Sequence, residues 1–323
     1  MTRIICGVDI ASRSLEARVG QQGATGSFAN SPEGIAALGA FCHEHPVELV
    51  AMEATGGYEQ QAFAQLSEQG LPVAILNPRA VRQFAQSMGS LEKTDLIDAG
   101  MIAWYAEVKK SRPVCVAPES QRHLRALVTR LRQLTEMRTA QLNQQRLVTD
   151  RAVQAWFKKL LAVLGRQIRD LEKRIAALLD QDPLWRELDQ AFRTIKGVAD
   201  RTVARLMAEM PEIGTLSNKT ISKLAGVAPL ANDSGQHQGK RVVRGGRATV
   251  REILFIVASV VGRYEPDFID FQRRLRAAGK PPRVVRIALA HKLQVRLNAK
   301  ARETRLRMAA VQPDRMTLGV ATV

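Results

Sequence analysis

The chain has 323 residues, of which 46% are hydrophobic, and it carries a formal net charge of +17. This composition excludes an intrinsically disordered protein, and the length allows two or three domains with cores of their own. No apolar stretch reaches the ~20 residues that span a bilayer, and the first residues lack the layout of a signal peptide. We therefore expect a globular cytoplasmic protein that does not bind a membrane.

The charge is divided unevenly along the chain. Residues 1–118 carry nine Lys and Arg against twelve Asp and Glu, a net of −3, whereas residues 119–323 carry a net of +20. A basic surface of that size attracts nucleic acids, and its affinity for them falls steeply as the salt concentration rises. The three cysteines are isolated in the sequence, so neither a zinc site nor a disulfide framework is indicated.

The first hundred residues alternate short apolar runs with segments of helical character. The apolar runs predict strands at residues 4–10, 13–19, 49–52 and 73–76. The second strand is predicted to form a hairpin with the first. Residues 20–26 are predicted to form a loop. Capping residues and prolines predict helices that begin near Ser31, Tyr58, Arg79 and Thr94. This alternation indicates an α/β domain over residues 1–112.

A different pattern follows a proline-containing linker at residues 112–118. Leucines and isoleucines recur at helical spacing within 113–183, and residues 119–164 contain neither Gly nor Pro. We expect two long helices there, forming either an antiparallel or an intermolecular coiled coil. Several Gly and Pro breaks then indicate a compact, mostly α-helical domain over 184–310, followed by a loose tail at 311–323.

Four acidic residues stand out by their positions. Asp9 and Glu53 each end an apolar strand, and Asp95 and Asp98 lie three residues apart on one face of a predicted helix. Acids in an apolar setting are costly unless something compensates their charge. Carboxylate oxygens are the hard ligands that Mg²⁺ prefers, and two such ions can hold the attacking and leaving oxygens of a phosphodiester. Each acid alone is explained equally well as a turn, loop or helix N-terminal residue, but the four together favour a metal site.

A second group of residues lies in the basic part of the chain. The segment Asp233-Ser234-Gly235 precedes four cations interspersed with glycines, namely Lys240, Arg241, Arg244 and Arg247. Glycines let the backbone approach a nucleic-acid strand closely, and the cations neutralise phosphates. On spacing alone, Ser234 is better explained as a surface turn residue. The segment Lys196-Gly197-Val198-Ala199 is typical of a helix-hairpin-helix turn, but Ala199 replaces the usual second glycine, so phosphate binding and simple packing stay open.

Four N-terminal segments carry a resemblance to a known family: Gly7-Val8-Asp9-Ile10-Ala11, Met52-Glu53-Ala54-Thr55-Gly56-Gly57-Tyr58, Asn77-Pro78 and Lys93-Thr94-Asp95-Leu96-Ile97-Asp98-Ala99. They resemble the DEDD transposases of the insertion sequence 110 family, which also includes related DNA invertases. The N-terminal domain of that family is similar to RuvC-type Holliday-junction resolvases, so the resemblance implies a ribonuclease-H-like fold. It also implies that Asp9, Glu53, Asp95 and Asp98 are catalytic and bind two Mg²⁺ ions, for which Mn²⁺ can substitute.

The C-terminal domain carries the same resemblance in Ala225-Gly226-Val227-Ala228-Pro229, Asp233-Ser234-Gly235, Gly239-Lys240-Arg241 and Gly245-Gly246-Arg247. The resemblance implies that Ser234 is a nucleophile that attacks a DNA phosphorus and forms a phosphoserine link. It implies donor and target double-stranded DNA as partners, together with a non-coding guide RNA that pairs with both. We also expect a homo-oligomer, a dimer or tetramer, in which Ser234 of one protomer meets the acids of another. The active protein is expected to associate with the nucleoid.

Three other functions stay open from the sequence. A RuvC-like nuclease or resolvase would use water and form no covalent adduct with DNA. A sugar-kinase or actin-like ATPase would use the segment from Gly7 to Ser12 for phosphate binding, but the sequence lacks a second glycine-rich phosphate loop. A non-catalytic nucleic-acid-binding protein would explain the charge and would leave the four acids without a role.

Overall fold

The computed structural model describes residues 3–89, 95–231, 233–235 and 237–311, and the side chains of the same residues except 95–97, 237, 238 and 311. The chain divides into two compact units, Met1–Ala117 and Pro118–Val323, and each is described by itself. Among the described residues, no helix is both long enough and apolar enough to cross a membrane.

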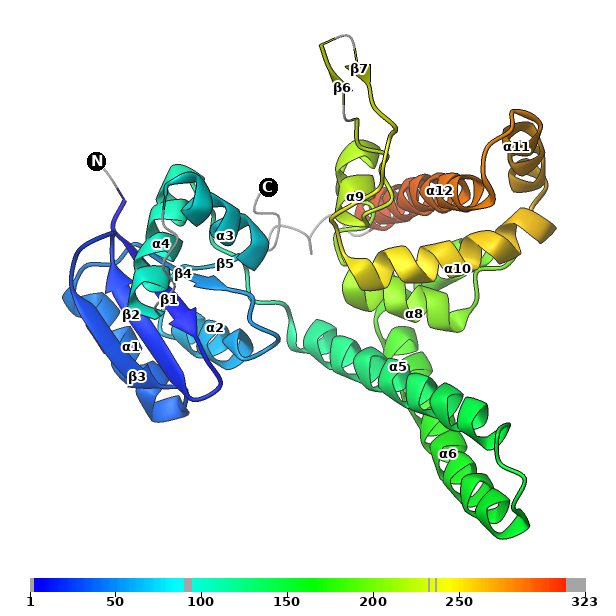
Figure 1. Ribbon diagram of the computed structural model, residues 1–323, viewed down its shortest axis with the longest axis horizontal. Helices are drawn as coiled ribbons and strands as arrows, with labels where there is room; N and C mark the ends of the chain where they lie inside the picture. The colour runs from blue at the N-terminus through cyan, green and yellow to red at the C-terminus, as the bar shows by residue number, and fades with distance from the viewer. Residues whose placement is uncertain (1–2, 90–94, 232, 236, 312–323) are drawn as a thin grey trace. The chain divides into compact units, whose positions relative to one another are not determined.

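The first unit is built on a five-stranded mixed sheet with the strand order β3-β2-β1-β4-β5 (Figure 1). The strands are β1 (Ile5–Ile10), β2 (Ser14–Val19), β3 (Thr25–Ala29), β4 (Leu49–Glu53) and β5 (Val73–Leu76). Strands β1, β2 and β3 are antiparallel neighbours, whereas β4 and β5 run parallel to β1. The sequence therefore predicted an α/β domain correctly.

Strand β3 corrects the prediction of a loop over residues 20–26, because Thr25 and Gly26 belong to this edge strand. The strand was hard to recognise because its side chains alternate between exposed and half-buried positions, and only Phe28 packs against the core. A strand at the edge of a sheet with one apolar contact lacks the apolar run from which buried strands are recognised.

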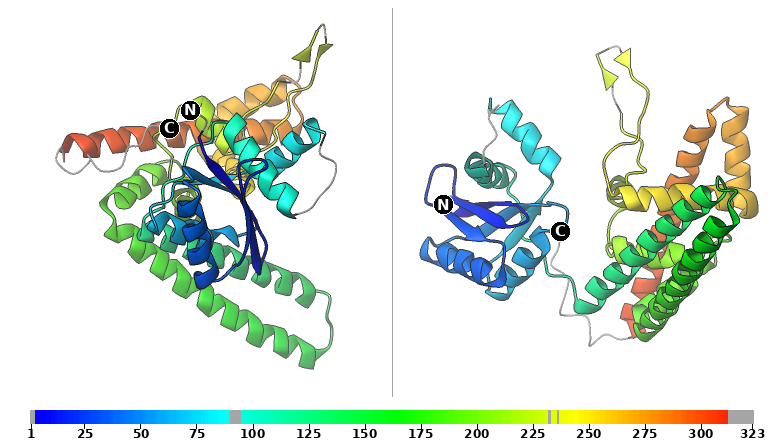
Figure 2. Two further views of the ribbon diagram at one scale, coloured as in Figure 1. Left: turned by 90° about the vertical axis from the view of Figure 1, so that its left-hand side faces the viewer. Right: turned by 60° about the horizontal axis from the view of Figure 1, so that its bottom comes forward.

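Helices cover both faces of the sheet (Figure 2). Helices α1 (Pro32–Glu44) and α2 (Glu59–Glu68) pack over one face, where their apolar residues meet Cys6, Val8 and Ile10 of β1. Helices α3 (Pro78–Ser87) and α4 (Asp95–Val108) pack over the other face. The odd-numbered positions of β1 face this second layer, and Asp9 is one of them.

Gly7 allows α4 to lie directly on β1. A Cβ atom at residue 7 would overlap the backbone oxygen of Ala99 and would lie 2.6 Å from the backbone nitrogen of Ala103. Any larger residue at this position must therefore push the helix away from the strand. Because Asp98 precedes Ala99, this close approach also brings Asp98 towards the carboxyl end of β1.

The second unit begins with a long helical hairpin. Helix α5 (Glu119–Gln145) and helix α6 (Arg151–Gln181) pack against each other within the chain (Figure 1). Asp150 caps α6, since its Oδ1 accepts hydrogen bonds from the backbone nitrogens of Ala152 and Val153. The two predicted helices are thus present and form an intramolecular antiparallel pair; an additional intermolecular coiled coil stays a prediction.

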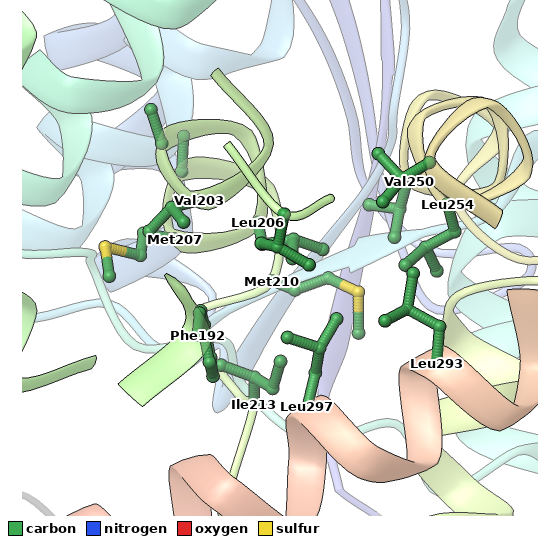
Figure 3. Close-up of a cluster of buried hydrophobic side chains, with 14 of the residues drawn as sticks. Phe192, Val203, Leu206, Met207, Met210, Ile213, Val250, Leu254, Leu293 and Leu297 are labelled. Atoms are coloured by element: carbon green, nitrogen blue, oxygen red, sulfur yellow. The ribbon is translucent and has the colours of Figure 1, made fainter. Parts of the chain in front are cut away.

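The rest of the second unit is a compact set of helices. These are α7 (Pro183–Arg193), α8 (Asp200–Glu209), α9 (Asn218–Leu224), α10 (Ala248–Tyr264), α11 (Pro266–Ala277) and α12 (Pro282–Val311). A short hairpin of β6 (Asp233–Ser234) and β7 (His237–Gln238) lies between α9 and α10. Figure 3 shows the core, in which Leu206 and Met210 meet Leu254, Leu293 and Leu297. Of the tail predicted at 311–323, residues 312–323 lie outside the described residues.

Replacing Gly7 by alanine tests the approach of α4 to β1. We expect Gly7→Ala to lower the free energy of unfolding by about 1–3 kcal/mol, because the new methyl group overpacks a helix–sheet contact. Gly165→Ala is the matched control, since a Cβ there meets only the end of Arg169 at 3.5 Å. In this helical position alanine is expected to stabilise by roughly 0.5–1 kcal/mol. Urea unfolding of both variants checks the prediction, and equal stability of the two would contradict it.

Candidate functional site

A cavity of about 500 Å³ opens at the carboxyl ends of β1 and β4. Three of the predicted acids line it: Asp9 from β1, Glu53 from the end of β4, and Asp98 from the first turn of α4. The remaining wall comes from Ile10, Thr55, Pro78, Val81, Arg82, Ala85 and Met101. Glu53 follows Asp9 by 44 residues and Asp98 follows Glu53 by 45, and yet all three line the same cavity.

The register of the sheet explains why Asp9 and Glu53 meet. Strands β1 and β4 are parallel and pair Val8 with Met52, so Asp9 and Glu53 are the next residues on two neighbouring strands. Opposed residues of a parallel pair project to the same face of the sheet. Both side chains are half-buried, and both project towards the layer that contains α3 and α4.

Asp95 is the fourth predicted acid and the first residue of α4. It precedes Asp98 by three residues, and this spacing places the two residues on the same face of a helix. The side chain of Asp95 lies outside the described residues, so the structure shows three of the four acids at one cavity. Among the described side chains, no group of three His, Cys, Asp or Glu residues could hold a metal ion unaided.

The chemistry of the donors nevertheless suits a divalent cation. Three carboxylate side chains line the cavity, and no histidine or cysteine takes part in its described lining. A set of oxygen donors of this kind selects Mg²⁺ or Mn²⁺ over softer metals. Arg82 also lines the cavity and places a cation of the protein among the acids. A bound metal would thus need Asp95 or substrate oxygens to complete its coordination.

Glu59 is a residue of this region that the sequence did not single out. It is 5% exposed, and its Oε2 accepts hydrogen bonds from the backbone nitrogens of Thr55 at 3.0 Å and Gly57 at 2.9 Å. Burial raises the pKa of the Glu59 carboxyl, but hydrogen bonds from the Gln60 side chain and from the backbone outweigh this effect, and the net pKa is lowered. The ionised carboxylate thereby holds the turn that follows Glu53. An acid in the first turn after Gly56-Gly57 was the signal that could have revealed it.

Ser234 lies on the exposed hairpin of β6 and β7. Its partner across the hairpin is His237, and a backbone bridge between Leu230 and Val242 closes the base of the arm. The Ser234 hydroxyl forms no hydrogen bond with any residue that the structure describes. A serine in such a setting is accessible to a large substrate, and its role as a nucleophile stays a prediction.

The four cations after Ser234 differ in their surroundings. Lys240, Arg241 and Arg244 are exposed, and Arg241 lies 3.5 Å from the carboxylate of Asp233. Exposed ion pairs of this kind contribute little to stability, so Arg241 can exchange Asp233 for a phosphate at small cost. These three side chains are available to nucleic acid.

Arg247 has partners within the protein. Its guanidinium donates two hydrogen bonds to Glu212, at 2.7 and 2.6 Å, and one to the backbone oxygen of Glu209. Burial raises the pKa of Glu212, but hydrogen bonding to Arg247 and the charge of Arg247 outweigh it, and the net pKa is lowered. The structure thus gives Arg247 a bracing role where α10 begins; its contact with nucleic acid stays a prediction.

The turn before α8 packs against α10. Gly197 has a φ of +99°, and a Cβ there would lie 3.0 Å from Cγ1 of Val260. Ala199 is the N-cap of α8 and forms no side-chain cap. Packing against α10 therefore explains why residue 197 is a glycine, and packing was one of the two roles that the sequence left open for this turn. Phosphate binding at the turn stays a prediction.

Two family models match this chain. Residues 6–152 match a model described as a transposase, and residues 189–273 match the transposase family IS116/IS110/IS902. The first match contains the cavity with its acids, and the second contains the hairpin with Ser234. The two matches together span most of the chain.

Curated relatives extend the similarity over nearly the whole length. The pilin gene-inverting proteins of Moraxella bovis and Moraxella lacunata are each 27% identical over 327 residues, which cover 94% of this chain and 98% of the relative. The resemblance found in the sequence is therefore confirmed by both kinds of comparison. On these matches the chain belongs to the IS110 family of transposases, which are DNA recombinases.

Proposed function

We propose that this transposase cuts and rejoins DNA through a metal-binding tetrad of Asp9, Glu53, Asp95 and Asp98 and through Ser234 as the nucleophile. The observation that carries the proposal is the cavity at the ends of β1 and β4, which three of the four acids line. The mixed sheet, with acids at the ends of two adjacent parallel strands, supports a ribonuclease-H-like domain.

The tetrad would hold two divalent cations, Mg²⁺ or Mn²⁺. Bound there, the ions would supply Lewis-acid stabilisation of charge on the phosphate oxygens. The protein itself contributes the orientation of the carboxylates, which the β1–β4 register, the α4 contact at Gly7 and the turn held by Glu59 maintain. Apolar residues of the wall, Val81 and Met101 among them, restrict water around the reacting phosphate.

In the proposed step, Oγ of Ser234 attacks a phosphorus of the DNA backbone. A bond forms between Oγ and phosphorus, the bond from phosphorus to one deoxyribose oxygen breaks, and the serine proton passes to the departing oxygen through solvent. The phosphoserine retains the ester, so a DNA hydroxyl can attack it later and restore a phosphodiester without an external energy source. Lys240, Arg241 and Arg244 would hold the flanking phosphates.

The acids and Ser234 belong to different compact units of the chain. We infer that the active enzyme is a homo-oligomer, a dimer or tetramer, in which the Ser234 arm of one protomer serves the acids of another. The exposure of the arm supports this arrangement, since nothing in its own described surroundings activates the hydroxyl. Donor and target double-stranded DNA are the substrates of the proposed reaction, and the pilin gene-inverting relatives support inversion, beside insertion and excision, as an outcome to be tested.

The alternative within the same class is a RuvC-like nuclease or resolvase that uses water. It would use the same cavity and would leave Ser234 as a surface turn residue. The exposed position of Ser234 on a hairpin fits both functions, and the trapping of covalent adducts distinguishes them.

Replacing Asp98 tests the tetrad. We expect Asp98→Asn to lower metal-dependent DNA cleavage by at least about a hundredfold and to leave DNA binding unchanged. A loss of this size exceeds what is typical for a residue that only supports a metal ligand. Glu107→Gln is the matched control, because Glu107 is an exposed acid on the same helix. Cleavage is measured on gels against Mg²⁺ concentration. Full activity of the Asp98 variant would contradict a metal-binding role.

Trapping of covalent adducts on nicked suicide substrates tests Ser234. We expect the wild-type protein to form a protein–DNA adduct and Ser234→Ala to form none, whereas Ser120→Ala, which removes another exposed serine of the second unit, keeps it. Cleavage without any adduct in the wild type would favour the nuclease.

A mixture of Ser234→Ala and Asp98→Asn proteins should recover activity if the two parts act between protomers, and an inactive mixture beside an active wild-type control would oppose that arrangement.

We further propose that a non-coding guide RNA directs the enzyme, with sequence recognition delegated to base pairing. The net charge of +20 in residues 119–323 supports binding of both RNA and DNA. RNA that copurifies with the protein is expected to be one species encoded beside its gene, and digestion of that RNA should abolish recombination. Recovery of only mixed cellular RNA, with recombination unaffected by its removal, would argue against guidance.

A further inference from the structure

The turn between α11 and α12 lies in a stretch of chain without acids. Residues 271–302 contain ten Lys and Arg and no Asp or Glu. Several of these cations have partners inside the protein: Lys292 donates to the backbone oxygen of Asp267, Arg296 pairs with Glu265, and Arg302 donates to the backbone oxygen of Leu216. The cations at the turn itself, Arg273, Arg276, Lys280 and Arg283, are exposed.

A hollow of about 390 Å³ runs along this face of α11. It is lined by Ile269, Gln272, Arg273, Arg276 and Ala277, which recur at intervals of three and four residues on one side of the helix. Two guanidinium groups therefore border a recess large enough for a phosphate group. The recess lies on a different element from the hairpin with Ser234 and its basic loop.

Gln272 holds the guanidinium group of Arg276 in place. In the amide orientation that satisfies both of its polar atoms, Gln272 donates to the backbone oxygen of Gly262 at 2.8 Å and accepts from Nη2 of Arg276 at 2.7 Å. Gly262 belongs to α10, and any Cβ there would press on the Gln272 side chain at 2.9 Å. Arg276 is thus held by a contact between two helices, which reduces the entropy that it loses on binding an anion.

The backbone of the turn is also held in place. Gly279 adopts a φ of +69°, and the backbone nitrogen of Lys280 donates to the oxygen of Leu275 at 3.1 Å, which closes the end of α11. Two prolines follow, and the second begins α12. Arg273 forms an ion pair with the carboxylate of Asp270 at 3.1 Å, and both side chains are largely exposed. Such a pair is weak, so a phosphate can displace the carboxylate.

We propose that the α11–α12 turn is a second DNA-binding site, at which Arg273, Arg276, Lys280 and Arg283 bind successive phosphates of a duplex away from the bond being cut. The role of this site in recombination rests on the proposed DNA-joining function, whereas DNA binding at the site can be tested without it. Contacts with phosphates position a protein without reading sequence, so the site would hold the flanking duplex while Ser234 acts elsewhere.

Salt-dependent DNA binding tests this site. A variant in which Arg273, Arg276, Lys280 and Arg283 are all replaced by Gln is compared with one carrying Gln at Arg166, Arg169, Lys173 and Arg174, which are exposed on α6. Both lose three Arg and one Lys. We expect the first set to weaken binding of a long duplex roughly tenfold or more at 0.1 M salt, and to reduce the slope of log affinity against log salt by about 0.9 for each phosphate that the protein no longer neutralises.

The controls separate a local site from a general loss of charge. Equal weakening by the two sets would overturn the proposal, and so would a loss confined to RNA with duplex DNA binding unchanged. Thermal unfolding of both variants confirms that each is folded, and the single variant Gln272→Ala should weaken DNA binding in part because Arg276 loses its brace. The measurement needs no catalysis, so absence of a Ser234 adduct would refute the proposed chemistry without affecting this result.

Discussion

The parallel register of β1 and β4 is the constraint on which the proposed site depends. It places Asp9 and Glu53 side by side at the end of the sheet, beside a layer whose core is apolar. Half-buried acids in such a position repel one another and cost solvation energy, which the packing of the domain must offset. In the proposed function a divalent cation bound between the carboxylates would remove this repulsion.

Two further features keep the acids in this arrangement. Gly7 permits α4 to lie against β1, and Asp98 of α4 lines the same cavity as Asp9 and Glu53. Glu59 holds the turn after Glu53 through two backbone hydrogen bonds. Neither residue lines the cavity, yet both determine where the carboxylates lie. In known metal sites, supporting residues orient the ligands in the same way.

The second unit has a different construction. Its large apolar core, with Leu206 and Met210 at the centre, forms a rigid base for an exposed hairpin that carries Ser234. The cations of this unit fall into two groups, those that brace the fold, such as Arg247, and those that face solvent, such as Lys240 and Arg276. The net charge alone cannot distinguish them, because a guanidinium engaged by Glu212 counts the same as one that faces water.

The sequence by itself determined the α/β class of the first domain, the two long helices and the family, since apolar periodicity and short motifs are local properties of the chain. It also singled out Asp9, Glu53, Asp95 and Asp98 as candidate site residues from their positions at element ends. Only the tertiary structure decided that Asp9, Glu53 and Asp98 share a cavity, that residues 25–29 form an edge strand, and that Glu59 and Arg247 have structural partners. Those facts depend on strand register and on contacts between residues far apart in the chain, and no local pattern encodes either of them.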